Sequence, residues 1–244
     1  MGAMFPYDAA LLAAAQSSPQ DIPGVLATMQ DMEALMADGD GLKWFNLLYL
    51  QVTQAVKARE DAGGFSDPAW LAQLDVQFAG LYFEALRNFL SGQPSPGCWR
   101  ALFQRRDQAA IARIQFALAG VNAHINHDLP MAIVATCQVT GTVPQHGTAQ
   151  YQDYTALNTT LDSLVEQAKQ ELHVRLLGDA LPPVSHLEET LAAWSVAAAR
   201  ETAWTNSEIL WRLEGSPLAA GLLDGIDGLT TVAGKTILTP VPMV

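Results

Sequence analysis

The sequence has few charged residues and almost no cysteine. Only 16% of its 244 residues are charged, and its two cysteines, Cys98 and Cys137, form no Cys-x-x-Cys pair. Two thiols are too few for a disulfide framework, so the fold must be stabilised by its hydrophobic core. We therefore expect both cysteines to be reduced, as is usual for cytoplasmic proteins.

Basic residues are scarce as well. The chain has 13 Lys and Arg residues against 25 Asp and Glu residues, which gives a formal net charge of −12. Such a surface repels phosphate backbones and anionic membranes. No apolar run approaches the roughly 18 residues of a membrane span, and the N-terminus lacks a signal-peptide pattern. We expect a cytoplasmic protein that acts on a small-molecule substrate and binds neither nucleic acid nor membrane. The oligomeric state is left open.

Helical periodicity runs along nearly the whole chain, in which half of the residues are hydrophobic. Turn and capping signals, including a capping box from Ser185 to Glu188, separate the predicted helices. There is no internal repeat and no linker long enough to divide the chain. We predict a single all-α domain over 5–244, a bundle of roughly seven to nine helices around a buried central helix, with a loosely packed tail at 216–244 that holds one weak helix and an extended end. The predicted helices are 21–41, 41–61, 68–90, 98–107, 107–127, one from about 130, 152–177 and 186–213.

The central helix (107–127) carries the most informative stretch of the sequence. "IQFALAGVN" (114–122) has no charged residue, which indicates that no side of this helix faces water. It runs into "AHINHDLP" (123–130), which holds His124, His127 and Asp128. On a helix that advances by about 100° per residue, these three side chains share one face.

Three titratable side chains on a buried face predict a functional site, because a buried imidazole or carboxylate is unfavourable unless it is paired or ligated. One interpretation is a metal centre in which His124, His127 and Asp128 bind one divalent ion, zinc before others, with no other cofactor. Another is proton transfer, with His127 as the general base. The alternative is a hydrogen-bonded polar network in the core, with Asp128 capping the next helix.

Two more carboxylates are candidates for catalysis. Asp75, in "LDVQFAGLYFEAL", lies on the apolar side of its helix and needs a partner, either Arg113 in a simple salt bridge or the histidines. Glu201, in "ARETAW", lies between two tryptophans on its face, although a solvated i,i+4 pair explains it as well. We expect four residues to line a substrate pocket: Arg113, Tyr82, Asn158 and His146.

Five segments resemble a bacterial family of domains of unknown function: "WFNLLYLQVT", "LDVQFAGLYFEAL", "CWRALF", "IQFALAGVNAHINHDLP" and "ARETAW". They span roughly residues 40 to 215, and the resemblance implies an all-α fold and no established activity. The His124-x-x-x-Asp128 pair before Pro130 is also similar to the zinc-dependent phospholipase C and P1 nuclease group. The second His-x-x-x-Glu pair of that group is missing here. The resemblance therefore implies one metal, or two at most, bound by His124, His127 and Asp128 with Asp75 or His146.

Three functions follow as hypotheses. The first is a metal-assisted hydrolase acting on a small ester, amide or phosphoester, in which the ion activates a water molecule. Asp75 would complete the metal shell or orient a histidine. The second is a metal-free acid/base lyase, isomerase or cyclase with a small apolar substrate. The third is a non-catalytic small-molecule-binding or interaction domain in which the polar cluster is structural.

Overall fold

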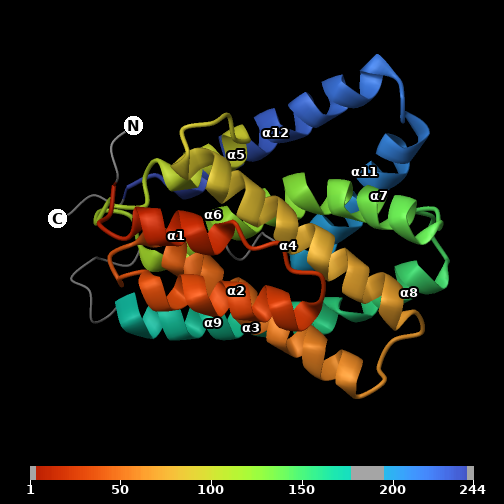
Figure 1. Ribbon diagram of the computed structural model, residues 1–244, viewed down its shortest axis with the longest axis horizontal. Helices are drawn as coiled ribbons and strands as arrows, with labels where there is room; N and C mark the ends of the chain where they lie inside the picture. The colour runs from red at the N-terminus through yellow and green to blue at the C-terminus, as the bar shows by residue number, and fades with distance from the viewer. Residues whose placement is uncertain (1–3, 177–194, 241–244) are drawn as a thin grey trace.

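The computed structural model describes residues 4–176 and 195–240, and all regular elements in these ranges are helices. This confirms the predicted all-α class (Figure 1). Each helix in the described ranges is too short or too polar to cross a membrane. The elements are α1 (Asp8–Ala15), α2 (Ile22–Leu35), α3 (Gly41–Asp61), α4 (Pro68–Leu90), α5 (Gly97–Phe103), α6 (Arg113–Ala123), a π-helix (His124–Asp128), α7 (Leu129–Thr140), α8 (Ala149–Ala156), α9 (Asn158–Leu176), α11 (Val196–Arg212) and α12 (Pro217–Ile237).

Helix starts follow the capping signals of the sequence. The Asp40 carboxylate accepts a hydrogen bond from the Leu42 amide at the start of α3, and the Asp67 carboxylate accepts one from the Trp70 amide at the start of α4. Each bond satisfies an amide that has no partner inside its helix. The predicted ranges 41–61 and 68–90 agree with α3 and α4.

The chain around the central helix differs from the prediction. Helix α5 ends at Phe103, and α6 begins at Arg113 rather than at residue 107. From Arg113 the chain stays helical through the π-helix and α7 to Thr140. The predicted helix 152–177 is divided into α8 and α9, while the start of the predicted helix 186–213, with its capping box, lies outside the described residues.

The C-terminal region is more regular than we predicted from the sequence. Instead of a loose tail, α12 forms a 21-residue helix that packs along α5 and α6 (Figure 1). The Gln115 side chain donates to the carbonyls of Ile237 and Thr239, at 2.7 and 2.8 Å. The Asn122 amide donates to the Thr230 carbonyl at 3.0 Å. The amide-bearing side of α6 is therefore covered by α12, which explains why this helix has no water-facing side.

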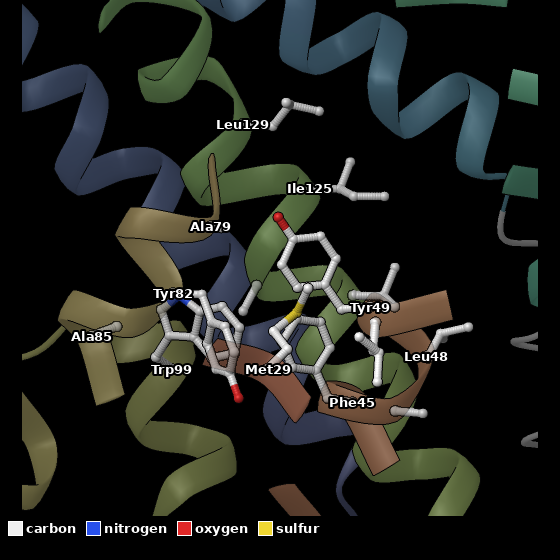
Figure 2. Packing of buried hydrophobic residues seen from close by; sticks show 14 of the residues in the cluster. Met29, Phe45, Leu48, Tyr49, Ala79, Tyr82, Ala85, Trp99, Ile125 and Leu129 are labelled. Carbon is white, nitrogen blue, oxygen red and sulfur yellow. The ribbon is translucent and has the colours of Figure 1, made fainter. Parts of the chain in front are cut away.

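An aromatic cluster fills the space between α3, α4 and α5. Figure 2 shows Phe45 and Tyr49 of α3 beside Tyr82 of α4 and Trp99 of α5. Phe45 packs edge-to-face on Tyr82 and Trp99, with ring centroids 5.0 and 5.2 Å apart. Such pairs add to the stabilisation from burial itself. The His124 ring of the π-helix packs against this cluster.

Candidate functional site

The cluster predicted from "AHINHDLP" lies in a π-helix, His124–Asp128, between α6 and α7. A π-helix has a wider turn than an α-helix and is frequently found at functional sites. It ends two residues before Pro130, and a proline has no amide hydrogen for the regular helical pattern. Asp128 has helical backbone angles and makes no side-chain cap. The expectation that it caps a separate helix is therefore wrong.

Asp128 is a buried hydrogen-bond acceptor shared by both histidines. Its carboxylate lies 3.0 Å from Nδ1 of His124 and 2.7 Å from Nδ1 of His127. The indole of Trp99 donates a third hydrogen bond at 2.9 Å. Burial acts to raise the pKa of Asp128, but the hydrogen bonds and charges of the two histidines lower it below its ordinary value. Asp128 is thus an ionised carboxylate that orients two imidazoles.

His124 is enclosed by aromatic rings. Its ring stacks on Phe78 of α4 with centroids 3.4 Å apart, and the edge of Tyr49 lies at 4.5 Å. Burial lowers the pKa of His124 and outweighs the opposing hydrogen bond to Asp128. With the Nδ1 hydrogen donated to Asp128, the Nε2 lone pair of the neutral ring is an acceptor. This Nε2 atom is buried and has no hydrogen-bond partner in the described part of the chain.

A cavity of about 90 Å³ lies beside His124, and its walls are almost entirely apolar. Helices α3, α4, α9 and α11 contribute to it together with the π-helix and its two neighbours. The only ionisable groups among its described wall residues are Tyr49, Asp75, His124 and Arg200. The apolar wall residues are Phe45, Leu48, Val52, Val56, Leu71, Leu74, Phe78, Val121, Ile125, Leu129, Leu157, Leu161, Val165 and Val196.

Asp75 lines this cavity without a partner. Its Oδ2 atom is buried, and no hydrogen bond or ion pair with another described residue reaches the carboxyl group. Burial raises the pKa of Asp75 to about 7, and the negative charge of Glu60 acts in the same direction. The expected partner, Arg113, instead lies over the Trp44 ring at 4.4 Å. Asp75 therefore faces inward as predicted, but the predicted salt bridge is absent.

Arg200 of α11 is a buried positive charge in the same wall, 5% exposed. It donates to Asn158 Oδ1 and to the Tyr154 carbonyl, both at 2.7 Å, and lies over the Tyr154 ring. Within the described ranges no carboxylate forms an ion pair with it. A buried guanidinium without a counter-ion is unfavourable, which makes it a candidate binding group for an anion. The Asn158 side chain, predicted to line the pocket, positions Arg200 instead.

The other imidazole of the π-helix faces away from the cavity. His127 is not a wall residue of the cavity, and one of its ring nitrogens lies within 4.8 Å of ligand atoms of Cys98 and Asp227. Burial lowers the pKa of His127, but the hydrogen bond and charge of Asp128 raise it by more. Because Asp128 is occupied by three donors, the predicted ligand set of His124, His127 and Asp128 does not converge on a shared ion. Among the described residues, the group with metal-ligand spacing is Cys98, His127 and Asp227, so His127 is the one predicted ligand that belongs to it.

Glu201 and His146 lie together, as a surface cluster outside the cavity wall. The Nε2 atom of His146 is 2.8 Å from Glu201, and its Nδ1 atom is 2.6 Å from Glu208. Tyr151 donates to Glu201 at 2.8 Å. The side chains of His146 and Glu201 are 41% and 48% exposed. The solvated interpretation of Glu201 therefore agrees with the structure, and neither residue reaches His124.

The last predicted pocket residue, Tyr82, is fully buried behind the cavity wall and donates to Asn46 at 3.4 Å. Sequence reasoning missed Arg200, Cys98 and Asp227. Arg200 has a usable signal in the sequence, because it is an arginine one residue before Glu201 on a mostly apolar helix. Cys98 is expected from the sequence only to be a reduced thiol, and Asp227 lies in the segment expected to be a loose tail, so no local pattern connects the two residues.

Comparisons with other proteins add the family but no activity. No curated protein and no solved structure shows significant similarity to the chain. The resemblance to zinc-dependent phospholipase C and P1 nuclease therefore stays a prediction. The profile of a family of unknown function, DUF5995, matches residues 22–240. The chain belongs to this family of unknown function.

Proposed function

We propose that the protein is an acid/base enzyme that moves a proton on a small, largely apolar carboxylate held in the cavity beside His124. One observation carries this proposal. Two wall residues of an otherwise apolar cavity, His124 and Asp75, each carry a buried polar atom without a hydrogen-bond partner among the described residues, and a third wall residue, Arg200, forms no ion pair with a described carboxylate. Unsatisfied polar groups of this kind are rare in folded proteins and gather at functional sites.

Arg200 and the size of the cavity define the substrate class. A carboxylate of the substrate would supply the counter-ion that the guanidinium lacks, and planar bidentate pairing favours a carboxylate. The cavity, of about 90 Å³, is small. The enclosed part of the substrate is therefore a short branched or unsaturated chain rather than a long lipid.

His124 and Asp75 would divide the proton transfer between them. The neutral His124 ring offers Nε2 as the base that accepts a proton from a carbon atom of the substrate, while Asp128 stabilises the imidazolium that forms. Asp75, with a pKa near neutrality, can deliver a proton to the developing negative charge. The apolar walls exclude water from the reacting atoms. Isomerisation, elimination and cyclisation all need such a pair.

This geometry favours proton transfer over metal-assisted hydrolysis by His124, His127 and Asp128. Both imidazoles already use Asp128 as an acceptor, and the two rings face different neighbours. The non-catalytic alternative is favoured by one observation, the largely apolar lining of the cavity, which by itself suits a carrier of small apolar molecules. The experiment below distinguishes the carrier from the enzyme.

Full-length protein is incubated in heavy water with vinylacetate, crotonate or ketoisovalerate, with and without chelator, and deuterium incorporation is followed by NMR. We expect exchange at a carbon next to the carboxylate or carbonyl of at least one probe, unchanged by chelator. Asp75→Asn and His124→Gln should each reduce it by about 10²-fold or more. Arg200→Gln should weaken probe binding, measured by calorimetry.

Glu84→Gln is the matched control, because Glu84 is an exposed carboxylate on the same helix as Asp75. It should exchange at the wild-type rate. If all three probes bind and none exchanges deuterium, the enzyme proposal is overturned and the carrier proposal is supported. Exchange that disappears with chelator would overturn the metal-free mechanism.

A further inference from the structure

Three residues of different helices meet on the side of the π-helix away from the cavity. Cys98 comes from α5, His127 from the π-helix and Asp227 from α12. Their possible ligand atoms all lie within 4.8 Å of one another. Cys98 and His127 are buried, whereas Asp227 is half-buried and connects the cluster to the surface.

Other groups hold two of these side chains in orientations suited to metal binding. The two carboxylate oxygens of Asp227 accept hydrogen bonds from the amides of Gly97 and Cys98, both at 2.9 Å. Nδ1 of His127 is bonded to Asp128 at 2.7 Å, which leaves Nε2 for an ion. A metal-bound histidine commonly gives its second nitrogen to a carboxylate in this way.

The donor types favour zinc. A thiolate, an imidazole and a carboxylate are all ordinary zinc ligands, whereas magnesium and calcium select oxygen ligands. Three protein ligands leave the fourth tetrahedral position open to water, on the side where Asp227 approaches the surface. We propose that Cys98, His127 and Asp227 form a zinc site that connects α5, the π-helix and α12.

This site is independent of the proposed proton-transfer cavity. None of its three ligands is a wall residue of the cavity, and neither His124 nor Asp75 belongs to it. Failure of one proposal therefore leaves the other intact.

The test uses full-length protein without a polyhistidine tag, stripped with chelator and titrated with cobalt(II) and then zinc. We expect about one equivalent of cobalt to bind with a thiolate-to-cobalt charge-transfer absorption that zinc abolishes by displacement. Zinc should also raise the thermal midpoint, because it binds the folded state. Cys98→Ser should lose the charge-transfer absorption. Asp227→Asn should keep the absorption but weaken binding by more than about tenfold.

Cys137→Ser is the matched control, since Cys137 is the second buried cysteine and lies in α7 outside the cluster. It should behave as wild type. Three results would overturn the site: wild-type protein without the absorption, an absorption lost in Cys137→Ser, or unchanged affinity in Asp227→Asn. The Asp227 variant retains the thiol, so it remains decisive even where circular dichroism shows that Cys98→Ser does not fold.

Discussion

Asp75 carries a buried carboxyl group that has no hydrogen-bond or ion-pair partner among the described residues. Its pKa of about 7 is raised by burial above the value of about 4 expected in the unfolded chain. The folded state therefore holds this proton more tightly than the unfolded state. The resulting stabilisation is fully present below about pH 4 and is lost as the pH rises through about 7.

Asp75→Asn should remove this pH dependence. At about pH 3.5 the variant and the wild type should unfold at similar denaturant concentrations, because the wild-type carboxyl is neutral there in both the folded and the unfolded state. At about pH 8.5 the variant should be the more stable protein, by up to roughly 4 kcal/mol, because it never carries the buried charge. Urea unfolding at both pH values measures the difference. Glu84→Gln should show no such change, and parallel pH profiles for Asp75→Asn and wild type would contradict the prediction.

At this scale the sequence predicted part of the site. The inward direction of Asp75 and the burial of His124, His127 and Asp128 followed from helical periodicity, and the structure agrees. The different surroundings of the two histidines could not be predicted, because they depend on helices α5, α11 and α12 that are distant in sequence. Arg200 and Asp227 reach the region only through that packing.

Among the helices, the contact between α3 and α6 shapes the cavity most directly. A Cβ atom on Gly120 would lie 2.3–2.6 Å from the Phe45 side chain, so only glycine allows this approach. Phe45 is 1% exposed and is itself a wall residue of the cavity. A clash there must move a ring that is packed on all sides.

Gly120→Ala should destabilise the protein by about 1–3 kcal/mol, because overpacking outweighs the better helix propensity of alanine. Gly80→Ala is the matched comparison, since a Cβ at Gly80 in α4 meets no atom within 4 Å. That substitution should stabilise by up to about 1 kcal/mol. Thermal or urea unfolding of both variants shows whether each substitution raises or lowers the free energy of unfolding. An equal effect of the two substitutions would show that the close contact at Phe45 is unimportant.

Helix existence was easier to predict than helix continuity. The ranges of α3 and α4 followed from capping residues and glycines, which act within one turn. The chain from Arg113 to Thr140 was divided wrongly at Asp128, because an acidic residue before a proline is the usual signature of a new helix. The π-helix keeps the chain helical there, and no local propensity indicates it.

For the whole molecule, Arg106 connects segments that are far apart in sequence. This fully buried side chain donates to Asp40 at 2.6 Å and to Asp8 at 2.8 Å, so it ties α1 and the start of α3 to the chain after α5. No local pattern distinguishes Arg106 from its neighbours in "QRRD". Its role depends on the packing of α1, the start of α3 and the chain after α5 against one another.

Arg106→Met should lower the free energy of unfolding by about 3–5 kcal/mol, because it leaves two carboxylates buried without a positive partner. Arg100→Met is the control, since Arg100 is exposed and should change stability by no more than about 0.5 kcal/mol. Urea unfolding of both variants measures the difference. A loss below about 1 kcal/mol in Arg106→Met would contradict a structural role for this network.

Because a single carboxylate, Asp128, serves both His124 and His127, the two sides of the π-helix are thermodynamically linked. A positive charge on His127 lowers the pKa of His124. A change in the charge of His127 therefore changes the proton affinity of His124. By thermodynamic reciprocity, a change in the charge of His124 alters the proton affinity of His127 by the same free energy. The two imidazoles therefore titrate as one coupled pair, and the proton affinity on one face of the π-helix reports the charge on the other.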